Sequence, residues 1–204
     1  MAASINVAQP IVHAETQFGI SGQAEIRRYA EKLTQTYLQG TPVQLDVAGA
    51  SGFIIANPAI VSVATAIIAG FSLEPGANLT ASGVAKTLVT GFQPQNQPLA
   101  VVIPIGAPIN DGTTSFVRAS DNMFFIGIYG DSNTAANATL AQAQVGTIRG
   151  LTKDAGNNFW YVDNFITTAA TGACLEIERL IDPVGTLNGR VLFRVTRAAQ
   201  QLFT

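Results

Sequence analysis

The hydrophobic positions of most of the chain fall in short runs separated by clusters of glycine, asparagine, aspartate and proline. Runs of this kind, rich in Val, Ile, Phe and Tyr and bounded by turn-forming residues, are typical of β-strands. About ten short strands with this spacing favour a mainly β fold, either a β-barrel or a jelly-roll-like body, over alternating strands and helices. The clearest runs are Phe53–Ala56, Val61–Phe71, Val84–Thr90, Leu99–Ile105, Met123–Tyr129, Phe159–Asp163, Leu175–Ile181 and Val191–Thr196.

Two runs near the C-terminus also predict which side chains face inward. Leu175 and Ile177 alternate with Glu176 and Glu178, as in a strand with one solvated face. The next run alternates in the same way, with Val191, Phe193 and Val195 inward and Arg190 and Arg194 outward. The segment between them, residues 182–189, ends in an Asn-Gly pair that favours positive φ. An Ala- and Gln-rich stretch, residues 134–144, is expected to hold a short helical turn.

The first forty residues have a different pattern. Residues 1 to about 20 show no sustained period, so we expect an extended arm that is ordered only where something holds it. Apolar positions then recur at helical spacing up to Gly40, which predicts one short helix. The chain is therefore expected to comprise an arm and helix, residues 1–40, and a β-rich body, residues 41–204. The packed face of the helix would carry Ile26, Tyr29, Leu33 and Tyr37.

The composition is unusual in its charges. Lys and Arg number 11 and Asp and Glu 13, so charged residues make up 12% of the chain, against roughly 25% in soluble proteins. The hydrophobic share of 48% is ordinary, so neutral polar residues have taken the place of ions. Amide and hydroxyl groups are easier to remove from water than ions. This composition therefore favours a subunit whose surface is covered by neighbours in an assembly.

Charge and residue counts also argue against several functions. A net charge of −2 gives no basic surface for nucleic acid. One cysteine and one histidine exclude a disulfide framework and a Cys/His zinc site, and we expect no cofactor. The most apolar stretch, Ala59–Phe71, is too short to span a bilayer, and the N-terminus lacks the pattern of a secretory signal. We expect a soluble protein made in a reducing compartment.

No catalytic constellation stands out. The single His13 lies in the expected arm, and Cys174 precedes an alternating strand, as a small buried residue would. Asp111, Asp121 and Asp131 fall in turn-rich loops without the spacing of a calcium loop. Glycine-rich segments lack the spacing of phosphate-binding loops. The residues therefore predict neither an enzyme nor a metal site.

Three stretches of the C-terminal half carry a family resemblance. They read A-Q-A-Q-V-G-T-I-R-G-L-T-K-D at 141–154, N-F-W-Y-V-D at 158–163 and L-I-D-P-V-G-T-L-N-G-R-V-L-F at 180–193. In this series, and in residues 40–43 and 67–72, the chain resembles the head decoration (cement) proteins of tailed bacteriophages. Arg149 departs from the family, in which an aromatic residue is common at that place. The resemblance covers roughly residues 40 to 200, and its motifs are turns and strands that name no catalytic group.

The resemblance implies a β-barrel-like body, often trimeric, that binds the outside of the capsid and stabilises the expanded, DNA-filled head. The expected partners are the major capsid protein and further copies in a homotrimer, without nucleic acid or membrane. The expected location is the capsid exterior of the virion, after synthesis in the host cytoplasm. We expect the arm and helix, residues 1–40, to make the cross-subunit contacts through Ile26, Tyr29, Leu33 and Tyr37, because linked weak contacts reinforce one another.

Three other functions share parts of this pattern. A minor capsid or head-fibre subunit would have the same low charge and many strands, but would not need a preformed lattice. A carbohydrate-binding β-sandwich would use Trp160 and Tyr161, with Asn157 and Asn158 nearby, as a stacking platform. A hydrolase would need His13 or a pair of aspartates in a cleft.

Overall fold

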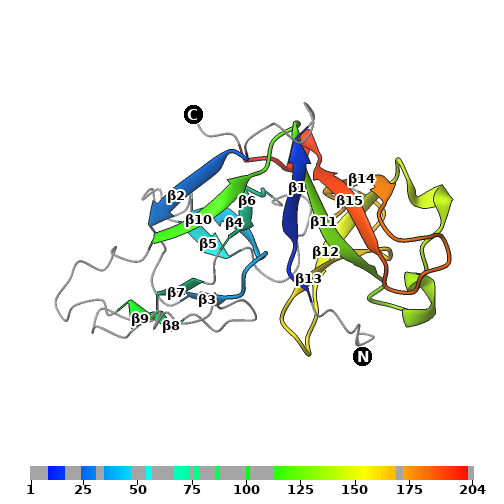
Figure 1. Cartoon of the computed structure of the whole chain (residues 1–204), viewed down its shortest axis with the longest axis horizontal. Coiled ribbons are helices and arrows are strands. Elements are labelled where there is room, and N and C mark those ends of the chain that lie inside the picture. Colours follow the sequence, from blue (N-terminus) through cyan, green and yellow to red (C-terminus); the bar gives the residue numbers. More distant parts are fainter. Residues whose placement is uncertain are drawn as a thin grey trace.

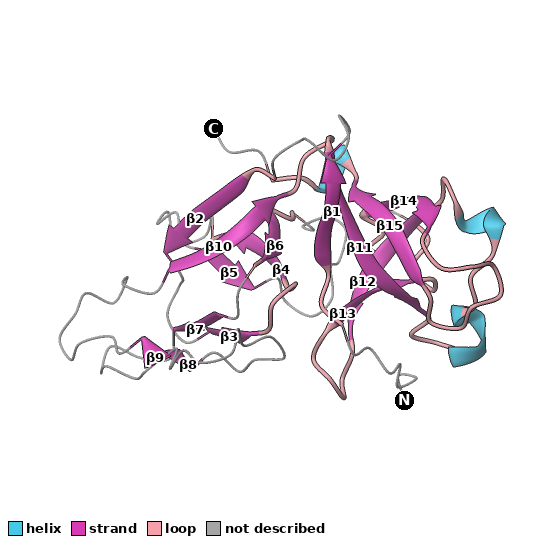
Figure 2. Ribbon diagram, viewed as in Figure 1, coloured by secondary structure: helices cyan, strands magenta, loops and turns pink. Residues whose placement is uncertain are grey.

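A computed structural model of the chain describes residues 9–16, 24–30, 35–46, 54–56, 67–73, 76–78, 86–87, 100–101, 113–168 and 172–201. Within these ranges the protein is mainly β, as the sequence predicted, and contains a closed five-strand barrel and a five-stranded sheet (Figure 1). The helical segments of the described residues are short 3₁₀ turns (Figure 2). They are η2 (Ala135–Ala138), η3 (Gln142–Gln144) and η5 (Arg197–Ala199).

The barrel is formed by the C-terminal half of the chain. Its strands are β11 (Met123–Gly130), β12 (Ile148–Lys153), β13 (Trp160–Asp163), β14 (Leu175–Leu180) and β15 (Arg190–Val195). They follow one another around the ring as β11-β13-β12-β14-β15, and β15 pairs back onto β11. Only the β11–β13 pair is parallel. Closing the ring removes the free strand edges that an open sheet would expose.

One strand from the N-terminal region joins the barrel. β1 (Val12–Thr16) pairs antiparallel with the first half of β11, and the register shifts between His13 and Glu15. The expected arm therefore includes a strand that is held by the body of the same chain. Residues 1–8 and 17–23 lie outside the described residues.

The second sheet lies beside the barrel (Figure 1). Its strand order is β2-β10-β6-β4-β5, with every pair antiparallel. Two small ladders, β3–β7 and β8–β9, complete the described strands. The bounds are β2 (Ile26–Ala30), β3 (Gln35–Tyr37), β4 (Pro42–Leu45), β5 (Ile54–Ala56), β6 (Gly70–Ser72), β7 (Gly76–Asn78), β8 (Lys86–Thr87), β9 (Ala100–Val101) and β10 (Thr113–Arg118).

The prediction of a helix between residues 21 and 40 is wrong. The described part of this segment forms β2 and β3 instead, and β2 pairs with β10 along its whole length. Helical spacing would have put Ile26 and Tyr29 on one face, but residues three apart in a strand point to opposite faces. Accordingly Ile26 is 57% exposed, while Tyr29 packs against a buried cluster on the other side of the sheet. Pairing with β10 overrides the local helical pattern.

The other strand predictions agree with the structure. Each of the eight apolar runs overlaps a described strand, although Val61–Phe71 meets β6 only at Gly70 and Phe71, and residues 134–144 contain η2 and η3. The alternation in β14 is confirmed, because Leu175 and Ile177 are buried and the glutamates between and beyond them are more exposed. In β15 the predicted inward residues are buried, and Leu192 is buried as well. Asn188 of the Asn-Gly pair has φ 51°, the positive value that the pair favours.

The barrel and the sheet share one hydrophobic core. Phe71 of β6 packs against Phe125 of β11 and Phe193 of β15, with ring centroids 4.6 and 5.9 Å away. Val117 of β10 belongs to the same cluster. The side-chain amide of Gln201 reaches the sheet, where it accepts the N–H of Leu45 and donates to the carbonyl of the same residue. The two parts are therefore joined by aromatic packing and by the C-terminal segment.

Gly70 gives a direct test of how closely β6 and β10 pack. A Cβ added at Gly70 would lie 2.0 Å from the carbonyl oxygen of Val117 and 2.6 Å from the ring of Phe116. We expect Gly70→Ala to lower the free energy of unfolding by about 3 kcal/mol, because the backbone must move to admit the methyl group. In the control Gly185→Ala, nothing lies within 4 Å of the added Cβ, so only the strain of its positive φ remains, about 1 kcal/mol. Chemical denaturation measures both, and equal losses would contradict the packing.

Candidate functional site

Of the four residues predicted to contact a partner, the three that the structure describes do not share one exposed face. Tyr37 is 5% exposed, and its hydroxyl donates to Oγ1 of Thr114 at 2.8 Å inside the chain's own core. Tyr29 is half-buried, with its ring centroid 5.9 Å from that of Phe116. Ile26 is exposed, and Leu33 lies outside the described residues. Among the three described side chains, Ile26 is therefore the one that is exposed to a partner. Its role in a partner contact stays a prediction.

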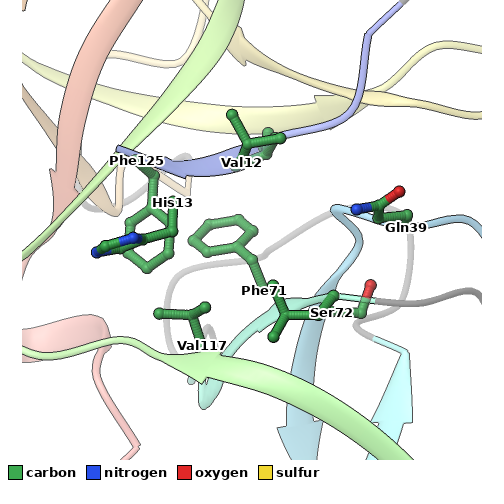
Figure 3. A pocket seen from close by; sticks show the side chains of 9 residues that line it. Val12, His13, Gln39, Phe71, Ser72, Val117 and Phe125 are labelled. Carbon is green, nitrogen blue, oxygen red and sulfur yellow. The ribbon is translucent and has the colours of Figure 1, made fainter. Parts of the chain in front are cut away.

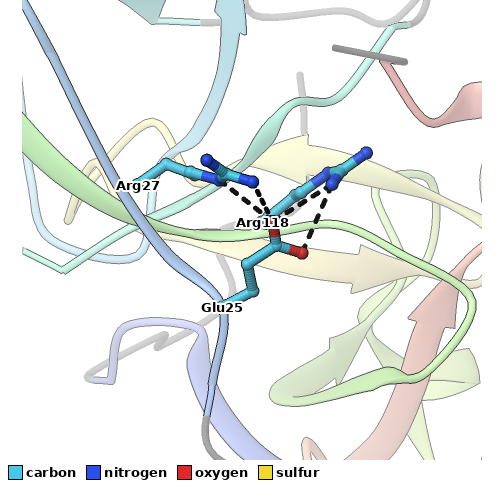
Figure 4. Close-up of polar contacts among 3 residues, drawn as sticks. All are labelled: Glu25, Arg27 and Arg118. Carbon is cyan, nitrogen blue, oxygen red and sulfur yellow. Dashed lines mark hydrogen bonds and ion pairs between the residues drawn. The ribbon is translucent and has the colours of Figure 1, made fainter. Parts of the chain in front are cut away.

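A cluster of one carboxylate and two guanidinium groups lies where β2 begins (Figure 4). Oε1 of Glu25 accepts hydrogen bonds from Nε of Arg27 at 2.9 Å and from Nη1 of Arg118 at 3.1 Å. The backbone N–H of Arg118 also donates to the carbonyl of Glu25 at 2.9 Å. Partial burial acts to raise the pKa of Glu25, but the bonds and charges of the two arginines outweigh it and keep that pKa below its usual value. The cluster fixes the start of β2 to the end of β10.

An apolar cavity of about 230 Å³ lies between β1 of the barrel and strands β6 and β10 of the sheet. Figure 3 shows Phe71, Val117 and Phe125 lining it, with the ring of His13 from β1 beside Phe125. The His13 and Phe125 rings are 6.1 Å apart and meet edge to face. The volume is below the roughly 300 Å³ from which small-molecule pockets usually begin.

The cavity brings together two residue types that a hydrolase would use, but the hydrogen bonds of the serine serve the fold. His13 and Ser72 both line it. The hydroxyl of Ser72 donates to the carbonyl of Leu38 at 3.2 Å and accepts from the N–H of Thr41 at 3.1 Å. Ser72 therefore holds the turn that leads into β4, and the structure gives no nucleophile–base pair among the lining residues.

A second region of interest is the end of the barrel at which three loops meet. They are residues 131–141, residues 163–168 and residues 182–189, and we call their exposed surface the loop face. Backbone hydrogen bonds join the first loop to the third at both Ala138 and Leu140. The short helices η2 and η3 lie at this end, on the right in Figure 2.

Two buried aspartates hold these loops in place. Asp163 is fully buried, and its Oδ1 accepts the N–H groups of Ser132 and Phe165, both at 3.0 Å. Oδ1 of Asp131, which is 2% exposed, accepts the N–H groups of Asn133 and Thr134 at 2.9 and 2.7 Å. Each carboxylate thus replaces the water that loop N–H groups would otherwise need.

Asn164 connects the carboxylate of Asp131 to strands of the barrel. Its Nδ2 donates to Oδ2 of Asp131 at 3.0 Å, and its Oδ1 accepts the hydroxyl of Tyr129 and Nε of Arg149. Burial raises the pKa of Tyr129 above its usual value, which further favours the protonated hydroxyl that donates in this bond. Arg149, which departs from the family resemblance, therefore has a defined polar partner here.

The loop face exposes three large apolar side chains among neutral polar ones, and it carries no unpaired charge among its own residues. Phe165, Val184 and Leu187 are 59%, 61% and 56% exposed. The charged residues of the three loops are Asp131 and Asp163, which are buried, and Asp182. The last of these forms an ion pair with Arg190 at 2.7 Å. The sequence did predict the turn at 182–189, but it did not single out these apolar side chains, although Val184 and Leu187 stand where turn chemistry favours polar residues.

The aromatic residues and the cysteine that the sequence raised as candidates are buried. Trp160 and Tyr161 are 3% and 1% exposed, so neither ring is available as a stacking platform for a sugar. Cys174 is 1% exposed, and burial raises the pKa of its thiol to about 12, which keeps it protonated and unreactive. Within the described ranges, no group of three or more His, Cys, Asp or Glu side chains is arranged to hold a metal ion. The same residues contain no helix that is long and apolar enough to cross a membrane.

The loop-holding role of Asp163 can be tested by an isosteric change. Asp163→Asn replaces one accepting oxygen by an NH₂ group that faces donors, so we expect the free energy of unfolding to fall by about 2 kcal/mol. Asp182→Asn is the matched control, because that carboxylate lies at the surface, and its loss should be smaller. Urea denaturation of both variants distinguishes the two cases. A loss at Asp163 no larger than at Asp182 would contradict the assigned role.

The Glu25 cluster predicts a dependence of stability on pH. Because the folded-state pKa of Glu25 is lowered, its contribution is present above the unfolded-state value of about 4.5 and is lost as pH falls through the folded value. Glu25→Gln should flatten the stability curve between about pH 5 and pH 3, by less than about 1 kcal/mol since the group is partly exposed. Denaturation across this pH range measures the effect. A Gln variant with the same pH curve as the parent chain would rule out the contribution.

Comparison with known proteins adds no assignment to this geometry. No protein-family model matches the chain, and no curated protein matches it significantly. The structure itself therefore leaves two features to explain in functional terms, the small apolar cavity beside β1 and the loop face, which has no unpaired charge among its own residues.

Proposed function

We propose that the protein is a decoration protein that binds the exterior of a bacteriophage capsid as a homotrimer and stabilises the expanded head. The observation that carries this proposal is that all three stretches resembling such proteins belong to one closed barrel. Residues 141–154 include η3 and β12, residues 158–163 include β13, and residues 180–193 join β14 to β15. The main part of the resemblance, which spans residues 141–193, thus follows a single structural unit, whereas residues 40–43 and 67–72 contribute to β4 and β6 of the sheet.

The surface of the barrel supports the same proposal. A protein that stabilises a lattice needs a rigid body and contact surfaces that lose little free energy when water is removed. The closed ring and the buried Asp131 and Asp163 provide rigidity, and the loop face offers apolar side chains without an unpaired charge. Such a surface is less expensive to desolvate than an ionic one.

The proposed mechanism is preferential binding to the expanded state of the shell. A ligand that binds one state of a protein more tightly than another shifts the equilibrium toward the state that it prefers. In a trimer, each further contact with the lattice forms at a high effective concentration once the first has formed, so individually weak contacts add to a strong attachment. The major capsid protein supplies the repeated partner in this mechanism.

Purified chain mixed with expanded empty heads tests the proposal. We expect the chain to sediment with the heads, to appear on their outer surface by cryo-electron microscopy, and to raise the temperature at which the shells break. Heads in the unexpanded form are the control and should bind less. A chain that ignores both kinds of head would refute the proposal, and one that assembles into shells or fibres by itself would favour a minor capsid or head-fibre subunit.

The oligomeric state has its own test. Sedimentation equilibrium of the purified chain at micromolar concentration, with heads absent, should give the mass of three copies. A stable monomer both in solution and on the particle would contradict the trimer while leaving attachment to the head intact.

A further inference from the structure

We infer that the loop face, with Phe165, Val184 and Leu187, is the surface that contacts the capsid, and that its partner is an uncharged, apolar patch repeated over the protein shell. This inference rests on the proposed function and names the contact that the function needs. It also replaces the expected contact through Tyr29 and Tyr37, whose side chains pack within the chain.

The charge of the loop face sets the chemistry of its partner. Two of its carboxylates are buried and satisfied by loop N–H groups, and the third, Asp182, is paired with Arg190. No lysine or arginine belongs to the three loops. Two arginines lie at the edge of the loops, where Arg190 is paired with Asp182 and Arg149 donates to Asn164. An apolar patch would cover Phe165, Val184 and Leu187 without burying an unpaired ion of the loops themselves.

The loops are also organised before any partner binds. The N–H groups of Ser132 and Phe165 are bound by Asp163, and the first and third loops are joined by the bond from Leu140 N–H to Thr186 O at 2.9 Å. A loop that is already ordered loses little conformational freedom on binding. The exposed side chains are therefore presented on a fixed frame, as a contact with a rigid lattice requires.

The size of the apolar surface favours a repeated partner over a single one. Three side chains that are each a little over half exposed offer on the order of 300 Å² of apolar area. A stable complex of two proteins buries roughly 800 Å² on each partner. The loop face alone would therefore give a weak pair, either with a second copy or with a single subunit. A lattice that engages several copies at once overcomes this deficit.

The described surface provides a matched comparison for this region. Ile26 on β2 is 57% exposed, about the same as Leu187 at 56%, but it is flanked by Glu25, Arg27 and Arg28. An apolar side chain among ions is harder to cover without also desolvating charge. Substitution at Ile26 therefore removes a similar exposed side chain from a surface that the inference leaves outside the contact.

The experiment compares binding to expanded heads for the full chain and three variants. The loop variant combines Phe165→Ser, Val184→Ser and Leu187→Ser, the control is Ile26→Ser, and Val184→Asp is a single change at the most exposed of the three loop positions. We expect the loop variant to bind at least tenfold more weakly, Val184→Asp to be weakened as well, and Ile26→Ser to bind like the parent chain. Thermal unfolding and sedimentation of each free variant show whether folding and oligomeric state are kept.

Each outcome has a defined meaning. Loss of head binding in both loop variants, with folding and oligomeric state unchanged, supports the inference, and if the triple variant fails to fold, Val184→Asp decides. Parent-like binding of the loop variants overturns the inference but leaves the proposed function standing. If the loop variants change the oligomeric state instead, the loop face is an interface between copies and the inference is wrong. If the parent chain itself does not bind heads, the proposed function fails and the inference fails with it.

Discussion

The contact of Phe71 with Phe125 and Phe193 is the interaction on which the rest of the structure depends. The first ring belongs to the five-stranded sheet, and the other two belong to the barrel, where β11 and β15 close the ring. Aromatic side chains bury a large area, and their packing adds to that burial. Without this contact the barrel would expose β11 and β15 side chains, and the sheet would lose the partner for one of its two apolar faces. The cavity beside β1 is lined by two of these rings, Phe71 and Phe125, so it is a gap at the contact between the two parts.

The small number of charges acquires a structural meaning in the folded chain. Asp131, Asp154 and Asp163 are buried and accept backbone N–H groups, so they act as internal supports for loops. Others, such as Glu25 and Asp182, are held in ion pairs with arginines of their own chain. The described part of the exterior therefore carries fewer unpaired charges than the composition alone indicates. An exterior of this kind is stable in water only where neutral polar groups cover it, or where a partner does.

Most strands could be predicted from the sequence because their apolar residues alternate or cluster between turn residues, as in β14 and β15. Among the strands that were not predicted, two lack that signal: β12 contains Arg149, Thr152 and Lys153, and β10 opens with two threonines and a serine. β2 failed for a different reason, since its spacing fits a helix and only the pairing with β10 selects a strand. The loop face could not be predicted because exposure at Phe165 depends on which loops meet at the barrel end, and the order of strands is not written in alternation.

The order of residues along the chain has a consequence for biosynthesis. β15 completes the ring by pairing with both β14 and β11, and Gln201 then ties the barrel to Leu45. These are among the last of the described residues to leave the ribosome. During translation, therefore, β11 and β14 have unsatisfied edges and Phe71 lacks one of its aromatic neighbours. A nascent chain with such edges is prone to pair with other chains, so a chaperone that shields them would be needed most just before residues 190–201 emerge.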